Sequence, residues 1–280
     1  MSAGWKPVTR HRKCPHCGHD SWCCIGLRGI LCMRMESPWR VTHKDGAVGW
    51  FHPFEGPEYK TRPLPARPVM PRPDFRKMIE AWSQETPEWD IKMLAVKLGV
   101  AVRALGALGC CWSESHRAWA FPMSDERGDV IGIRLRYDNG SKRAVTGTNG
   151  SGLFIPDENL ISAQKTLFLT EGPTSTAAAL TLGLWAIGRP NNCAGGNTIN
   201  AFIKRHRVRE AVIWADNDKD QVRRDGSRHN PGIEGAHNYA PPCRSTVLLT
   251  PAKDARVFLN LGGTAAQLES SLRGVVWRQP

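Results

Sequence analysis

The chain lacks the features that mark membrane proteins, secreted proteins and one large class of motor. Its longest apolar stretch, 176–188, is interrupted by Thr and Gly and is shorter than the roughly 20 residues that a membrane-spanning helix needs. No early segment joins a basic start to an apolar run of signal-peptide length, which argues against secretion. Because no stretch is long enough to span a bilayer, we expect no membrane partner. No G-x-x-x-x-G-K-[ST] phosphate loop occurs, so we expect no motor of that type.

What the chain does have is positive charge and cysteine. It carries 38 Lys and Arg against 26 Asp and Glu, a net charge of +12. The basic residues are spread along the whole chain, which suits a polyanionic partner such as nucleic acid. Nine cysteines without a secretory leader indicate the cytosol, where clustered thiols bind metal more often than they form disulfides.

Composition divides the chain into regions. Residues 1–52 are rich in Cys, His, Trp and Gly, and seven prolines then lie within 53–73. Such proline spacing is typical of an extended, semi-rigid linker. We therefore predict four segments: a small module at 1–52, a linker over 53–75, a region of helices and β hairpins over 76–164, and an α/β domain over 165–280.

The two larger regions carry distinct secondary-structure signals. Thr86 as N-cap, Pro87 at the first helical position and Gly99 as the stop predict a helix. An Asp-Asn-Gly turn at 138–140 joins two strands of a predicted hairpin. From 165 onward apolar strands alternate with helices, which predicts a mainly parallel sheet flanked by helices.

A metal site is indicated near the start of the chain. Cys14-Pro-His-Cys17, with a Gly directly after it, is typical of a zinc half-site, because its short loop lets two thiolates converge on one ion. Cys32 would supply a third ligand. Three side chains are candidates for the fourth: Cys23, Cys24 and His19. Such a closed site would be structural and would add folding energy to a module too small for a full core.

Acidic residues follow two of the apolar strands in the second half. Glu171 follows the apolar strand at 167–170, and a second apolar strand, in AVIWADNDKD, ends in Asp216, Asn217 and Asp218. Residues two apart on an extended segment point the same way. If the two strands are neighbours in a parallel sheet, all three carboxylates meet at its carboxyl edge, where open α/β sheets bind ligands. Because clustered carboxylates repel one another, we expect a hard cation, and Mg²⁺ fits.

These motifs together resemble a known family. The order EGPTSTAAAL, VIWADND and PAKD resembles the TOPRIM domain shared by bacterial-type DNA primases, type IA and II topoisomerases and some nucleases, over roughly 165–260. The leading CPHCGHDSWC…LCMR, then GWFHPF, the Pro-rich linker and WAFPMSDERGDVIGIRLRYDNGSKRAV, look like the primase half of phage and plasmid primase–helicases. This second resemblance spans most of the chain.

The resemblance implies a DNA primase that makes short RNA primers on single-stranded DNA from ribonucleoside triphosphates. It implies an N-terminal zinc-ribbon module that binds template, followed by a TOPRIM catalytic domain. The chain would be encoded by a phage or other mobile element and act in the cytoplasm of a bacterial host. Because the phosphate loop is missing, the replicative helicase would be a separate polypeptide.

The resemblance also assigns roles to individual residues. The zinc ligands it implies are Cys14, Cys17, Cys23 and Cys32. The acids it implies for Mg²⁺ or Mn²⁺ are Glu171, Asp216 and Asp218, with Glu171 either a ligand or the base that accepts the hydroxyl proton. Lys142 is implied as catalytic. The basic side chains it implies for template and nucleotide are Arg134, Arg136, Arg143, Arg189 and Lys253.

Other readings of the same motifs remain. A TOPRIM nuclease uses the same acids but has no need of a leading zinc ribbon. A non-catalytic single-stranded nucleic-acid-binding protein derived from a primase would not be expected to keep all three acids. A topoisomerase needs a nucleophilic tyrosine, and the chain has three, in the linker, at a hairpin and near a loop: Tyr59, Tyr137 and Tyr239. We reject the topoisomerase because the chain is also too short for a DNA gate.

Overall fold

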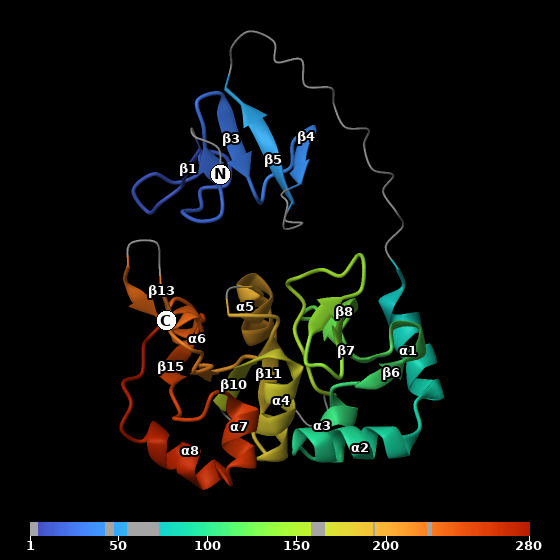
Figure 1. Cartoon of the computed structure of the whole chain (residues 1–280). Coiled ribbons are helices and arrows are strands. Elements are labelled where there is room, and N and C mark those ends of the chain that lie inside the picture. Colours follow the sequence, from blue (N-terminus) through green and yellow to red (C-terminus); the bar gives the residue numbers. More distant parts are fainter. Residues whose placement is uncertain (1–4, 43–47, 55–72, 158–165, 193, 223–225) are drawn as a thin grey trace. The chain divides into compact units, whose positions relative to one another are not determined.

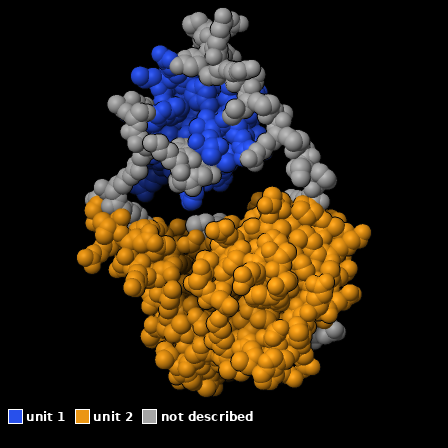
Figure 2. Space-filling model, turned by 45° about the vertical axis from the view of Figure 1, so that its right-hand side comes forward, with its two compact units in different colours: residues 1–71 blue, residues 72–280 orange. Residues whose placement is uncertain are grey.

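The computed structural model describes residues 5–42, 48–54, 73–157, 166–192, 194–222 and 226–280. The chain forms two compact units, 1–71 and 72–280 (Figures 1 and 2). Most of the predicted linker, 55–72, lies outside the described residues. Its predicted ends are each occupied by a regular element, since Pro53 belongs to a strand and Phe75 opens a helix.

The first unit is a small antiparallel sheet. Its strands are β1 (Lys6–Pro7), β2 (Cys24–Ile25), β3 (Gly29–Cys32), β4 (Trp39–Thr42) and β5 (Val48–Pro53), in the order β1-β2-β3-β5-β4. Among its described residues, the buried core cluster contains three aliphatic side chains: Val8, Ile25 and Ile30. Three cysteines complete that core: Cys14, Cys23 and Cys32. Since so little apolar area is buried here, the thiols must contribute to the stability of this unit.

The second unit begins with helices and an antiparallel sheet. The helices are α1 (Phe75–Glu85), α2 (Glu88–Leu98), α3 (Val102–Ala107) and the short 3₁₀ turn η1 (Glu114–His116). The strands are β6 (Cys111–Ser113), β7 (Ala118–Ser124), β8 (Val130–Arg136) and β9 (Lys142–Ala144), in that order in the sheet. Alternate residues of β7 face opposite sides: Ala118 and Ala120 lie in the core beneath α1, whereas Trp119 and Phe121 lie in the main core.

The predicted helix around 88–98 exists, but its start was predicted wrongly. Pro87 is the N-cap of α2, and Thr86 instead caps the C-terminus of α1. The Thr86 hydroxyl donates to the Trp82 carbonyl oxygen at 2.6 Å and accepts from the Trp112 amide at 2.8 Å. Gly99 ends α2 in the left-handed conformation, with φ 67°, as the sequence predicts.

A parallel sheet follows. Its strands are β10 (Thr166–Glu171), β11 (Ala186–Arg189), β12 (Glu210–Trp214) and β15 (Arg244–Leu248), in the order β11-β10-β12-β15. A two-stranded hairpin, β13 (Gln221–Val222) and β14 (Arg228–His229), interrupts the alternation. The helices are α4 (Gly172–Thr181), α5 (Gly196–Arg205), α6 (Pro231–His237), α7 (Ala255–Asn260) and α8 (Ala265–Leu272). The predicted mixed α/β fold with a parallel sheet is confirmed (Figure 1).

Both faces of the parallel sheet are covered, which is why its strands are apolar throughout. Phe168 and Trp214 lie in one core with residues of α4, α7 and α8. Leu169 and Ile213 lie in another core with residues of α5 and α6. Within the described residues, no helix is long and apolar enough to cross a membrane.

A short extended segment joins the two sheets of the second unit. Leu153 exchanges backbone hydrogen bonds of 2.8 Å with Ser124 of β7, and Phe154 exchanges bonds of 2.9 Å with Gly188 of β11. Side chains on β8 therefore have a fixed position relative to the ends of the parallel strands.

Gly188 is the tightest point of this junction. A Cβ there would overlap the Thr176 hydroxyl and lie 2.9 Å from the Phe154 ring. We expect Gly188→Ala to destabilise the chain by about 1–3 kcal/mol, the usual cost of overpacking a core. Gly150→Ala is the matched control, because a Cβ at Gly150 meets nothing within 4 Å. Equal urea midpoints for the two variants would contradict this account of the junction.

Candidate functional site

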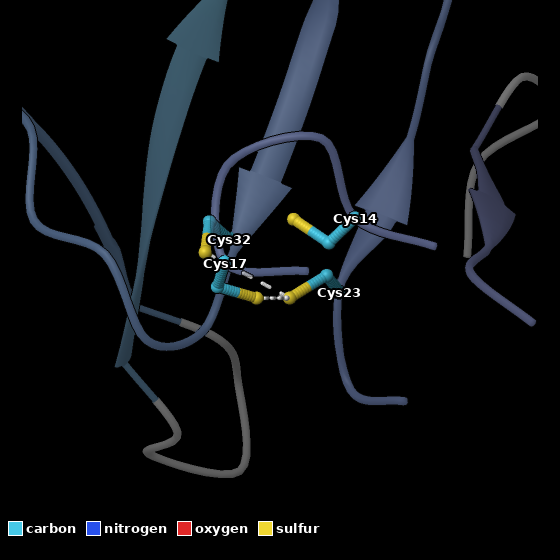
Figure 3. A group of neighbouring side chains, drawn as sticks. All are labelled: Cys14, Cys17, Cys23 and Cys32. Carbon is cyan, nitrogen blue, oxygen red and sulfur yellow. Dashed lines mark hydrogen bonds between the residues drawn. The ribbon is translucent and has the colours of Figure 1, made fainter. Parts of the chain in front are cut away.

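Four cysteines converge in the first unit. The sulfur atoms of Cys14, Cys17, Cys23 and Cys32 all lie within 4.8 Å of one another and point toward a common centre (Figure 3). The Cys17–Cys23 and Cys23–Cys32 sulfur distances are 3.6 and 3.8 Å. A tetrahedral zinc site with Zn–S bonds of about 2.3 Å has sulfur–sulfur edges of about 3.8 Å. The cluster is thus suited to a structural Zn²⁺.

The surrounding backbone favours thiolates at this cluster. The Met33 and Met35 amides donate to the sulfurs of Cys23 and Cys32 at 3.4 and 3.2 Å. Burial raises the pKa of Cys23 to about 12. Burial opposes ionisation of Cys17 too, but a hydrogen bond from the His19 backbone and contacts with the other thiols outweigh it and lower its pKa to about 7. Metal binding at this site would therefore release protons.

The structure distinguishes the three candidates for the fourth ligand. Cys23 is fully buried within the cluster. Its neighbour Cys24 opens strand β2, pairs with Leu31 and so points the other way. His19 contributes its backbone carbonyl, which accepts from the Cys14 amide at 2.7 Å. In the described part of the first unit, neither Cys24 nor the His19 ring belongs to the cluster.

We expect one Zn²⁺ per purified chain. Cys32→Ser should lose the metal and unfold the first unit, because the site holds a unit with little apolar core. Cys24→Ser, the adjacent control, should keep both metal and fold. Metal analysis by mass spectrometry, together with circular dichroism, checks both variants. Retention of full zinc content by Cys32→Ser would contradict the assignment.

Acidic side chains gather at the carboxyl edge of the parallel sheet. Glu171 is the last residue of β10, and Gly172 turns the chain into α4 with φ 72°. The register pairs Leu169 with Ile213, so Glu171 lies level with the residues that follow β12. Asp216 is two residues beyond the end of that strand. The strand order thus brings the acids of β10 and β12 to one edge.

One carboxylate oxygen at this edge has no partner. The Oε2 atom of Glu171 is buried and makes no hydrogen bond with any described residue. Burying a polar atom in this way is costly. An oxygen of this kind is a suitable ligand for a hard cation such as Mg²⁺.

The charges at the edge act strongly on one another. The pKa of Asp216 is raised to about 8, chiefly by burial and in part by the charges of Glu171, Asp254 and Asp218, while the charge of Lys142 acts against the rise. Burial also raises the pKa of Glu171, with a contribution from Asp218. Three basic groups oppose that rise: Arg189, Lys142 and Arg134. The acids therefore share one partly desolvated region with these three basic side chains.

Asp254, which the PAKD motif places after a strand on the same edge, also belongs to this group, although the resemblance does not assign it to the cation. It is the N-cap of α7, where its side chain accepts from the Val257 amide at 2.8 Å. The preceding residue, Lys253, is exposed and its carbonyl accepts from the Asn217 amide at 2.6 Å. The signal was present in PAKD, because this motif follows β15 just as Asp216 follows β12.

Two arginines and a lysine line the neighbouring antiparallel sheet. Arg134 and Arg136 share a face of β8, and Arg136 pairs directly with Lys142 of β9. The Arg134 guanidinium donates to the Pro190 carbonyl oxygen at 3.4 Å. Burial lowers the pKa of Arg134, and Glu171 opposes that effect. These contacts and charge effects place the shared face of β8 and β9 beside the acids.

The two remaining arginines lie differently. Arg189 ends β11 directly beside Glu171 in the register and is only 2% exposed. Its charge therefore acts on Glu171 from within the protein. Arg143 pairs with Leu135, which lies in the core beneath α1. Arg143 thus occupies the face of the sheet opposite Arg134, with its guanidinium 6.0 Å from the centre of the Tyr137 ring.

Comparison with known proteins identifies the fold. No protein-family model matches the chain, and no curated protein sequence matches it. Solved primase structures do match: a DnaG catalytic core at 14% identity, covering 72% of this chain and 79% of that chain with a TM-score of 0.54. The zinc-binding and RNA polymerase domains of Aquifex aeolicus primase match at 13% identity, covering 73% and 60% with a TM-score of 0.56.

A third similar structure is a DnaG primase catalytic domain bound to single-stranded DNA, at 15% identity, 72% and 77% coverage and a TM-score of 0.52. At these identities the comparisons establish the fold, which is that of primase catalytic cores. The resemblance to primases found in the sequence motifs is confirmed at this level.

The raised pKa of Asp216 predicts a pH dependence of stability. An unfolded Asp has a pKa near 3.9, so the folded state holds an extra proton between about pH 4 and 8. Stability therefore falls as pH rises through that window. Asp216→Asn should lose less stability than wild type between pH 5 and 8, measured as urea midpoints without added divalent cation. If the urea midpoints of the two proteins changed with pH in parallel, the raised pKa of Asp216 would be contradicted.

Proposed function

We propose that this chain is a DNA primase that joins ribonucleotides on a single-stranded DNA template. The observation that carries the proposal is the buried, unpartnered Glu171 oxygen beside Asp216 and Asp218. The basic face of β8 and β9 lies next to these acids. The primase-core fold of solved neighbours supports the same reaction class.

The acids fit a catalytic cation. Every side chain in the group offers carboxylate oxygen, the ligand type that Mg²⁺ and Mn²⁺ prefer. Asp216 and Asp218 would hold the ion, with Glu171 either as a further ligand or as the base that accepts the hydroxyl proton. Bound Mg²⁺ or Mn²⁺ would supply positive charge at the phosphate oxygens. We propose the region 165–280 as a TOPRIM domain on these grounds.

The reaction requires positioning and charge neutralisation more than covalent help from the protein. A 3′-hydroxyl oxygen attacks the α-phosphorus of an incoming triphosphate, the bond to pyrophosphate breaks, and the hydroxyl proton passes to Glu171, where Glu171 acts as the base, or to water. Lys142, Arg134 and Arg136 would bind the triphosphate and balance its negative charge. Arg189 would hold Glu171 ionised from the protein side. Lys253 is exposed at the same edge and would contact template or nucleotide.

The first unit would act on the template. We propose that the zinc-bearing module, 1–52, grips single-stranded DNA while 76–164 and 165–280 carry out synthesis. Arg143, on the far face of the β8–β9 hairpin, would meet template phosphates rather than the triphosphate. We further propose that a separate replicative helicase is its partner. We also propose that the chain is encoded by a phage or other mobile element and acts in the cytoplasm of a bacterial host.

Primer synthesis by the full chain tests the proposal. With single-stranded DNA, Mg²⁺ and labelled ribonucleotides, wild type should produce short labelled oligonucleotides. Asp216→Ala, Asp218→Ala and Glu171→Gln should each lower the rate by about 100-fold or more, the scale of single electrostatic groups at a reaction centre. Glu269→Gln, at an exposed site on α8, should leave the rate unchanged.

Two results would overturn the proposal. The first is comparable synthesis by wild type and any two of the three acid variants. The second is cleavage of the single-stranded DNA with no synthesis, which would identify a nuclease that uses the same acids.

A further inference from the structure

The segment that carries two of the acids lies beyond the hydrogen-bonded ladder of the sheet. Strand β12 ends at Trp214, and 216–220 has no regular structure. Within the described residues, two backbone hydrogen bonds join this segment to the sheet side: the Ala215 amide donates to the Leu248 carbonyl oxygen at 3.0 Å, and the Asn217 amide donates to the Lys253 carbonyl oxygen at 2.6 Å. The positions of Asp216 and Asp218 therefore depend on what holds this segment, called here the acid loop (215–220), from its other side.

On that other side lies a single amide side chain. The Asn230 Nδ2 atom donates to the Asp218 carbonyl oxygen at 2.5 Å and to the Asn217 side-chain oxygen at 3.1 Å. The Asn230 Oδ1 atom accepts from the Ile233 amide at 3.1 Å, as the N-cap of α6. Since only the oxygen can accept that amide hydrogen, the NH₂ group must face the acid loop.

The first turn of α6 is packed directly against the same loop. A Cβ at Gly232 would overlap the Asp216 carbonyl oxygen and lie 3.1 Å from a carboxylate oxygen of Asp218. Glycine is thus the residue that lets the helix approach this closely. Beside the same turn, the His229 ring lies 2.7 Å from the Glu234 carboxylate.

We propose that Asn230 is a positioning residue of the acid site: it fixes the acid loop to α6 and so sets where Asp216 and Asp218 stand relative to Glu171. The inference rests on the proposed divalent-cation site. Asn230 itself would not touch the cation or the nucleotide. Its amide holds the backbone of Asp218 and the side chain of the residue between the two acids, which leaves the carboxylates free for a ligand.

The expected consequence is a change in cation affinity. Removing a residue that orients metal ligands typically lowers the affinity for the metal by about 10- to 100-fold. Asn230→Ser isolates this role, because serine is an equally good N-cap but its short hydroxyl has no second donor for the acid loop. Asn149→Ser is the matched control: Asn149 also caps a turn, accepting from the Ser151 amide at 3.1 Å, and in the described part of the chain it makes no hydrogen bond to the acid loop.

The experiment measures Mn²⁺ binding by the zinc-loaded full chain, with calorimetry or electron spin resonance. The dissociation constant should rise about 10- to 100-fold in Asn230→Ser and stay unchanged in Asn149→Ser. Gly232→Ala gives a second, independent variant: its Cβ displaces the loop, so Mn²⁺ affinity should fall as well. Excess Mn²⁺ should restore primer synthesis by Asn230→Ser, since the acids are still present.

The outcomes separate this inference from the proposed function. If wild type binds Mn²⁺ and Asp216→Asn does not, the cation site stands, and wild-type affinity in both Asn230→Ser and Gly232→Ala would overturn the positioning role alone. Failure of excess Mn²⁺ to restore synthesis by Asn230→Ser would also overturn it. If wild type binds no Mn²⁺ beyond the level of Asp216→Asn, both the proposed site and the positioning role are wrong.

Discussion

Mutual repulsion among partly buried carboxylates is the constraint on which the rest of the second unit depends. Burial is the largest cause of the raised pKa values of Asp216 and Glu171; Glu171, Asp254 and Asp218 add to the rise at Asp216, and Asp218 adds to the rise at Glu171. A fold gains nothing from such crowding in itself, because each charge would be better solvated in water. The crowding becomes favourable when a cation is bound, and this is the physical case for a site rather than a core.

The fold makes that arrangement through strand order rather than through local sequence. Pairing β10 with β12 in parallel brings two strand ends to one edge, and β15 adds a third. The 153–154 bridge then fixes the basic face of β8 beside them. Gly188 and Gly232 mark the two places where backbones approach too closely for a side chain. The zinc-suited module is a separate unit with its own small core, so its stability rests on its thiols.

The sequence predicted the elements whose signals are local. The CxxC knuckle, the strand-end acids and the αL stop at Gly99 each depend on neighbouring residues alone. It could not predict which side of a hairpin Arg143 would occupy, nor that Arg189 would be buried, because both depend on register and packing. Asn230 had no visible signal, since its partners are twelve and thirteen residues away. Thr86 was misassigned because the same Thr-Pro pair can end one helix as readily as begin the next.

A crystal structure of the zinc-loaded chain with Mn²⁺ tests the central claim most directly, through the anomalous signal of manganese. The account predicts a manganese ion at the carboxyl edge, within about 2.2 Å of carboxylate oxygens from the group that contains Glu171 and Asp216. It also predicts that Glu171 Oε2 gains a partner there, the ion or a water bound to it. A map with no manganese at this edge, and with Glu171 Oε2 hydrogen-bonded to the protein instead, would contradict the account.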